Sequence, residues 1–298
     1  MFFSNIRPGV CGLVCLLSAG LAVQAQAIEV VTDPGDYLPA PPGTNLAVLY
    51  LQNNQYDTYH ANGKEQPTKL GLETNLGLLR FVRYMEVGGF IIDPQIAIPY
   101  GEIRMNKNFT GLTASSNTGM GDPLIGGATW LYNDPAKDRH VALLTMVSVP
   151  FGDYDGDLGP LNIGQNRWRG IVQLGYATQL IPRSLFEIIG EYAVHGSNDD
   201  YFGMKQTRED SYGIQSHLSY SLLPSTRVSV SYYLSFAGET KLDGVAQKDE
   251  ANDNRWLLSA TTSFTRDTQV IVQYGEAIRV RNGPFENQRL NLRLVKMF

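Results

Sequence analysis

Two neighbouring stretches of the chain decide the fold: SYGIQSHLSYSL at residues 211–222 and RVSVSYYLSF at residues 227–236. In both, apolar or aromatic side chains such as Leu218 and Tyr220 alternate with small or polar ones such as His217. Because successive side chains of a strand point to opposite faces, each stretch predicts a strand with one apolar and one polar face. Strands of soluble sandwiches usually have about five or six residues, so runs of this length favour strands that cross a membrane.

The same alternation recurs along the chain and predicts an all-β protein, a transmembrane antiparallel up-and-down β-barrel of about twelve strands. No segment after residue 27 has eighteen consecutive apolar residues, which argues against a helical membrane protein. The predicted strands are 44–52, 68–83, 88–100, 119–132, 140–151, 166–180, 185–195, 209–222, 227–237, 254–264, 269–280 and 287–298.

The connections between these predicted strands sort by length. Short ones follow the even-numbered strands, at 85–87, 133–139, 181–184, 223–226 and 265–268. Long polar ones follow most of the odd-numbered strands, at 53–67, 101–118, 152–165, 196–208 and 238–253. Short periplasmic turns and long external loops are typical of Gram-negative outer-membrane barrels, so we expect both termini on the periplasmic side.

The N-terminal residues indicate export. Arg7 precedes an apolar run at 9–23, and Ala25-Gln26-Ala27 forms a small-x-small cleavage site, which together predict a signal peptide over residues 1–27. Both cysteines lie inside that segment, so the mature chain has no thiol. The Pro-rich residues 28–43 are expected to form an extended N-terminal tail, and residues 44–298 the outer-membrane barrel. The net charge of −5 argues against nucleic acid as a partner.

Aromatic residues eight positions apart share the apolar face of three predicted strands. Eight residues of tilted strand rise roughly 19 Å, close to the spacing of the two aromatic girdles that border a ~25 Å apolar band. The pairs are Trp168 and Tyr176, Tyr212 and Tyr220, and Trp256 and Phe264.

The last predicted strand resembles the C-terminal signal that barrel-insertion machinery reads. Leu290, Leu292, Leu294 and Phe298 match that signal, whereas Lys296 stands where an apolar residue is usual. The expected partners are therefore this machinery and outer-membrane lipid.

Two short motifs carry a family resemblance. They are Gly119-Met120-Gly121-Asp122-Pro123 and Pro150-Phe151-Gly152-Asp153-Tyr154, and a predicted strand-turn-strand joins them. This block resembles the outer-membrane family "MetA-pathway of phenol degradation". The resemblance implies a porin-like barrel linked to aromatic catabolism that passes small hydrophobic or aromatic compounds across the outer membrane.

The acidic residues of these motifs lie where strands meet external loops. Asp122 and Asp153 are expected to tie loop backbone amides, or else to bind a cation weakly. The run Asp153, Asp155, Asp157 lacks the distal glutamate of an EF-hand, so a solvated turn is favoured over a calcium loop.

Alternation also assigns a polar set to the inside of the barrel. Arginine–glutamate pairs there would either plug the lumen or line a narrow wet pore. We favour a constricted pore, with the 28–43 tail as a candidate plug. The candidate lumen-lining residues are Lys69, Glu73, Asn75, Arg167, Arg169, Gln173, Glu187, Glu191, His217, Arg227, Arg255, Gln273, Arg289, Asn291 and Arg293.

Two other functions fit parts of the sequence. His195-Gly196-Ser197-Asn198 is similar to the nucleophile block of outer-membrane phospholipases, in which a histidine activates a serine. His195 shares its strand face with Glu187 and Glu191, however, and should point inward, away from lipid. Long polar loops would instead suit a structural or adhesive barrel. The sequence favours a channel that is not an enzyme, with no cofactor and no metal site.

Overall fold

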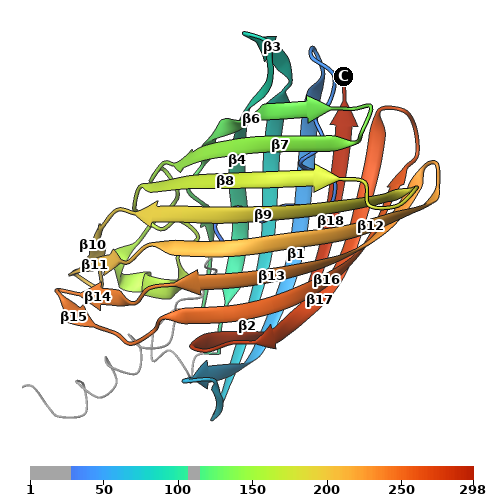
Figure 1. Cartoon of the computed structure of the whole chain (residues 1–298). Coiled ribbons are helices and arrows are strands. Elements are labelled where there is room, and N and C mark those ends of the chain that lie inside the picture. The colour runs from blue at the N-terminus through green and yellow to red at the C-terminus, as the bar shows by residue number, and fades with distance from the viewer. Residues whose placement is uncertain (1–27, 107–114) are drawn as a thin grey trace, which may run out of the picture.

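The computed structural model describes residues 28–106 and 115–298. Twelve long strands close into one antiparallel barrel, which confirms the predicted fold class (Figure 1). Around the barrel the order is that of the chain, and β2 pairs with β4 to complete the ring. The strands are β1 (Asn45–Ala61), β2 (Lys64–Arg83), β4 (Phe90–Arg104), β6 (Leu124–Asp134), β7 (Arg139–Ser148), β8 (Arg169–Thr178), β9 (Ser184–His195), β12 (Ser211–Leu223), β13 (Thr226–Ala237), β16 (Ala251–Ser263), β17 (Thr268–Arg279) and β18 (Gly283–Met297).

The barrel closes between its first and last strands. β1 pairs with β18 over nearly its whole length. At the end of the seam, the Asn45 amide donates to the Phe298 carbonyl and the Phe298 amide to the Asn45 carbonyl, each at 3.0 Å. Among the described residues, closure gives each of the twelve barrel strands a partner on both sides, which is what a hydrocarbon environment requires of a β-structure.

Shorter strands and one helical turn lie at the rims of the barrel. β3 (Met85–Val87) and β5 (Ser116–Met120) pair with β4. A four-stranded sheet lies at the end of the barrel away from the C-terminus (Figure 1). Its strands are β10 (Asn198–Tyr201), β11 (Met204–Arg208), β14 (Thr240–Leu242) and β15 (Val245–Ala246). The helical turn η1 (Gly156–Leu161) contacts β10.

Several predicted loops are in fact strand. The prediction of a loop at 53–67 is wrong, because β1 and β2 continue through these residues. Only Asn62 and Gly63 form the turn between the two strands. Both residues have positive φ angles, 51° and 74°, as a type I′ hairpin turn requires. The loops expected at 196–208 and 238–253 likewise contain the four-stranded sheet, and the turn expected at 85–87 is β3. Residues 107–114 of the expected loop 101–118 lie outside the described residues.

The two faces of most strands are as alternation predicts. Outside, apolar side chains such as Leu218, Tyr212 and Val230 are exposed. Inside, polar side chains such as Gln215 and Ser219 are buried. The aromatic residues expected at the girdles lie on the outer face, with Trp168 56% and Phe264 70% exposed.

The predicted facing of β2 is wrong. Leu70 and Leu72, expected outside, are fully buried, whereas Lys69 is exposed. Glu73 and Asn75 also face outward, where both bond to Asn53, at 3.0 and 2.7 Å. Three lumen candidates are thereby corrected: Lys69, Glu73 and Asn75. The physical reason is that this part of the interior is itself apolar, because the buried leucines pack with Tyr56, Ile103, Met105 and Leu161.

No helix in the described part of the chain has the length and apolarity for a membrane span.

Candidate functional site

The N-terminal tail lies inside the barrel over residues 28–40, whereas residues 41–43 are exposed. Ile28, Thr32, Asp33 and Tyr37 are all buried, and their partners come from the inward faces of the strands. The Tyr233 hydroxyl donates to the Thr32 carbonyl at 3.1 Å. The prediction of a wholly extended tail is wrong, because residues 34–37 form a turn in which the Asp36 amide donates to the Asp33 carbonyl at 3.1 Å. The segment has no strand partner of its own, so its other backbone groups need bonds from barrel side chains.

Two inward glutamates bind the tail backbone. Glu191 accepts from the amides of Glu29 and Val30, at 2.6 and 3.1 Å. Glu187 accepts from the amides of Gly35 and Tyr37, at 2.7 and 3.2 Å. A carboxylate that accepts two backbone N–H bonds forms charge-assisted contacts, which are stronger than neutral ones. The tail is therefore held by specific bonds along its length.

The acidic side chains of the tail pair with inward arginines. Arg293 of β18 bonds to Asp33 at 3.1 Å and to Asp36 at 2.7 Å. Arg80 of β2 lies 3.7 Å from Asp36. At the start of the tail Glu29 contacts Arg169 of β8. Opposite charges on the tail and the wall thus fix its position in the lumen.

The remaining predicted lumen residues face inward, although their role as pore lining stays a prediction. Those that bond to the tail are Arg169, Gln173, Glu187, Glu191, His217, Gln273 and Arg293. Asn291 bonds to Gln273, Arg289 bonds to Glu286, and Arg227 lies beside Gly35. Arg167 and Arg255 complete the inward set and are described below.

Sequence reasoning missed other inward groups that hold the tail. Arg80 was missed because the facing of β2 was reversed. The Trp130 indole donates to the Tyr37 carbonyl at 3.1 Å, and Gln215 accepts from the Thr32 amide at 2.8 Å. Gln215 stands on the polar face of a predicted strand, so the alternation itself carried that signal.

A cavity of about 240 Å³ remains between the tail and the barrel wall, here called the luminal cavity. Its apolar lining includes Leu76, Leu78, Leu124 and Met146. Its polar lining is Glu29 and Asp33 of the tail, with Tyr50, Gln52, Arg80, Gln95, Gln273, Arg289, Asn291 and Arg293 of the wall. A chamber with one apolar side and one hydrogen-bonding side suits a small amphipathic solute.

The outer face of the same wall is hollowed. A hollow of about 1030 Å³ is lined mainly by outward side chains, among them Leu49, Leu51, Leu79 and Leu290. It shares six lining residues with the luminal cavity: Gln52, Leu76, Gly77, Leu78, Gln273 and Asn291. One layer of β-sheet therefore separates this outer hollow from the luminal cavity.

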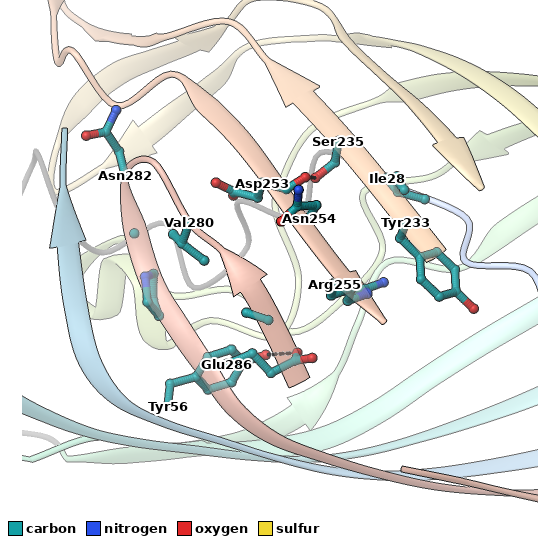
Figure 2. Close-up of a pocket in the computed structure, with 13 residues that line it drawn as sticks. Ile28, Tyr56, Tyr233, Ser235, Asp253, Asn254, Arg255, Val280, Asn282 and Glu286 are labelled. Carbon is teal, nitrogen blue, oxygen red and sulfur yellow. Dashed lines mark hydrogen bonds between the residues drawn. The ribbon is translucent and has the colours of Figure 1, made fainter. Parts of the chain in front are cut away.

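A second, smaller pocket of about 70 Å³ lies between Tyr56, Tyr233 and the start of the tail (Figure 2). Figure 2 shows the Tyr56 hydroxyl bonded to Glu286, a distance of 3.2 Å. Arg255 lines the pocket and lies over the Tyr233 ring, 4.9 Å from its centroid. The volume suits water or a small ion more than an aromatic ring.

The two family motifs form one clamp at the rim. The Met120 amide donates to the Asp153 carboxylate at 2.7 Å, and the Gly152 amide donates to Asp122 at 3.1 Å. Asp122 also accepts from the Gln165 amide at 2.8 Å. The predicted tethering of loop amides by the two aspartates is confirmed.

The glycines and Tyr154 of the motifs complete this clamp. A side chain at Gly152 would clash with the backbone at Gly121, and one at Gly119 with Asp153. Tyr154 extends the clamp, since its hydroxyl donates to the Asp200 carbonyl at 2.8 Å. Pro150 begins the second motif, two residues before Gly152. Within the described residues, no group of three or more histidine, cysteine or acidic side chains could hold a metal ion.

His195 points inward, as predicted. Its Nε2 atom lies 3.1 Å from the Ser211 hydroxyl and 3.9 Å from Glu29. The serine and the carboxylate approach the same ring nitrogen, whereas a catalytic relay uses both nitrogens.

The comparisons with known proteins identify the family. The model of the family "MetA-pathway of phenol degradation" matches residues 56–294. The chain belongs to this family. Among solved structures, this chain is similar to an outer membrane channel from Pseudomonas putida F1, with a TM-score of 0.85 and 29% sequence identity. That match covers 90% of this chain and 100% of the channel.

A more distant likeness concerns the fold alone. The transport unit of the autotransporter AIDA-I from Escherichia coli matches with a TM-score of 0.51 and 10% identity, covering 98% of this chain and 99% of that one. No curated protein matches the sequence. Fold and family together make this chain a β-barrel of the bacterial outer membrane.

Proposed function

We propose that this barrel is an outer-membrane channel for small hydrophobic or aromatic compounds. The luminal cavity is the observation that carries the proposal. A cavity of roughly 150 Å³ lined by apolar side chains is sufficient to bind benzene. At about 240 Å³, the luminal cavity has room for one substituted aromatic ring.

The lining of the luminal cavity fits both parts of such a solute, its apolar ring and its polar substituent. Leu76, Leu78 and Met146 offer dispersion contacts to a ring, while Gln52 and Asn291 offer hydrogen bonds to a hydroxyl substituent. The similarity to the Pseudomonas putida outer membrane channel supports passage across the membrane.

The route of the solute follows from the tail and the outer hollow. Because the tail fills the barrel axis, a solute needs either displacement of the tail or passage through the wall. Gly77 has no side chain to fill the wall, and it lines both the luminal cavity and the outer hollow. We infer that an apolar solute leaves sideways there, into the lipid around the barrel.

An enzymatic function is not favoured. The His195 ring is bonded inside the lumen, where a lipid ester does not reach, and the serine that it contacts, at 3.1 Å, is Ser211. An adhesive barrel would not need the luminal cavity. We propose two further partners. Outer-membrane lipid would contact the exposed leucines, and the barrel-insertion machinery would recognise β18.

Solute uptake into liposomes tests the proposal. Purified full-length protein is reconstituted, and entry of benzyl alcohol and of glucose is compared with protein-free vesicles. A channel for aromatic compounds raises the rate for benzyl alcohol more than that for glucose. Equal rates with and without protein would overturn the proposal.

A further inference from the structure

A group of three arginines and one histidine lies at one end of the tail and takes little part in the luminal cavity. Arg169 begins β8, His195 ends β9 and Arg208 ends β11. Arg167 lies in the bend two residues before β8. We call these four residues the cation cluster. Glu29 of the tail sits among them, in contact with Arg169, 3.8 Å from Arg208 and 3.9 Å from His195.

The cation cluster has unused hydrogen-bonding capacity. Arg167 and Arg169 are 5% and 8% exposed, yet the Nε atom of each has no hydrogen-bond partner among the described residues. The His195 Nδ1 atom and the Glu29 Oε1 atom are likewise without hydrogen-bond partners there. Buried polar atoms are rarely left unbonded, so each such atom calls for an explanation.

The charge on Arg167 is the least compensated in the cluster. Its side chain bonds to Gln206, a neutral amide. Burial, together with Arg208 and Arg169, lowers the pKa of Arg167 to about 10. A buried guanidinium beside two others favours a nearby anion, because burial without a counter-charge is costly.

The cation cluster is continuous with the luminal cavity through Glu29. The same residue that contacts Arg169 also lines the cavity beside Leu124 and Met146. A molecule with a carboxylate at the cluster and a ring among those side chains would satisfy both surfaces. The Glu29 carboxylate already stands where the carboxylate of such a molecule would bind.

We propose that the cation cluster is a binding site for the carboxylate of a small aromatic acid, and that Glu29 occupies it as a tethered competitor. This deepens the proposed channel function and rests on it. An aromatic acid that displaces Glu29 also loosens the first contact that holds the tail in the lumen.

The first test uses the wild-type full chain in detergent and two probes of the same ring, sodium benzoate and benzyl alcohol. Calorimetric titration should show benzoate binding about tenfold more tightly, since hydrogen bonds to charged groups exceed those to neutral ones. Equal affinities would overturn the anion site while leaving the channel proposal intact. If neither probe binds, the channel proposal fails as well.

Three variants separate a binding role from a structural one. Arg167→Gln should weaken benzoate about tenfold and leave benzyl alcohol unchanged. Glu29→Gln should tighten benzoate, because the competitor is gone. Lys205→Gln removes an exposed charge that pairs with Asp199 at the same rim and should change neither affinity.

Folding of each variant is checked by its shifted mobility on an unheated gel. Unchanged benzoate affinity in both Arg167→Gln and Glu29→Gln would contradict the proposal. If Arg167→Gln does not fold, the wild-type comparison and Glu29→Gln decide the question.

Discussion

The phenol ring of Tyr37 in the tail lies directly against Gly175 on the inward face of β8, and leaves no room there for a Cβ atom. The Tyr37 hydroxyl donates to Gln173, two residues earlier on the same face, at 2.9 Å. One missing side chain and one hydrogen bond thus seat the tail on the wall. Gly213 makes similar room for Ile28 on β12.

Gly175→Val should lift the tail off the wall. The added side chain overlaps the Tyr37 ring, a strain that costs roughly 1–3 kcal/mol if the tail stays in place. We expect a higher single-channel conductance in planar bilayers, because the tail leaves the lumen part of the time. Gly190→Val on the outer face of β9 has open space and is the matched control. An unchanged conductance in Gly175→Val would contradict the role of the tail as a plug.

Arg293 is expected to contribute more to the free energy of unfolding than an exposed arginine does. It pairs with Asp33 and Asp36, and its side chain is only 9% exposed. Removing one partner of a buried ion pair leaves uncompensated charge and costs roughly 3–5 kcal/mol. Arg293→Met should therefore lower the free energy of unfolding in urea by that amount. Arg279→Met, an exposed site at the end of β17, should have little effect, and a similar loss in both would refute the assignment.

Acid should release the start of the tail. Burial raises the pKa of Glu29, but Arg169, Arg208 and His195 outweigh it and hold the pKa below its usual value. A lowered pKa means that the ion pairs stabilise the fold above the usual glutamate range and that this stability is lost as the pH falls below it. We expect protection of the Glu29 and Val30 amides from hydrogen exchange to fall in that acidic range. In Glu29→Gln the protection should be low at neutral pH as well.

Filling the outer hollow should slow apolar solutes selectively. Gly77→Trp places an indole on the outer face of β2, in the part of the wall that lines both the luminal cavity and the outer hollow. Benzyl alcohol uptake should fall while ion conductance along the barrel axis stays the same. Gly190→Trp, also on the outer face, controls for adding an aromatic ring to the lipid-facing surface. Equal uptake in the two variants would argue against a sideways exit.

The alternation of side chains was sufficient to predict the barrel and most strand positions. It separates two faces of a strand but does not say which one meets lipid. For β12 and β13 the polar face was inside, since serine and glutamine line a hydrogen-bonded lumen. In β2 the leucines face inward, because Leu70 and Leu72 pack against Leu161 of η1. The partner of that packing lies about ninety residues away in the sequence, where local periodicity carries no signal.

Loops and the site were harder to predict for a related reason. Asn62-Gly63 is a hairpin signal, but it lies within a polar stretch that resembles an external loop. The bonds between Glu191 and Glu29, and between Arg293 and Asp33, join residues far apart in the chain. Charge composition predicted that the inward arginines and glutamates would be paired. It did not predict that many of their partners would come from the tail.

The most direct test of the account is to locate an aromatic solute in the barrel. Crystals of the protein soaked with bromobenzene and measured at the bromine absorption edge would give its position. A channel for aromatic compounds should give anomalous density in the luminal cavity, beside Leu78 and Met146. Bromine found only on the outer leucines, with none in the lumen, would contradict it.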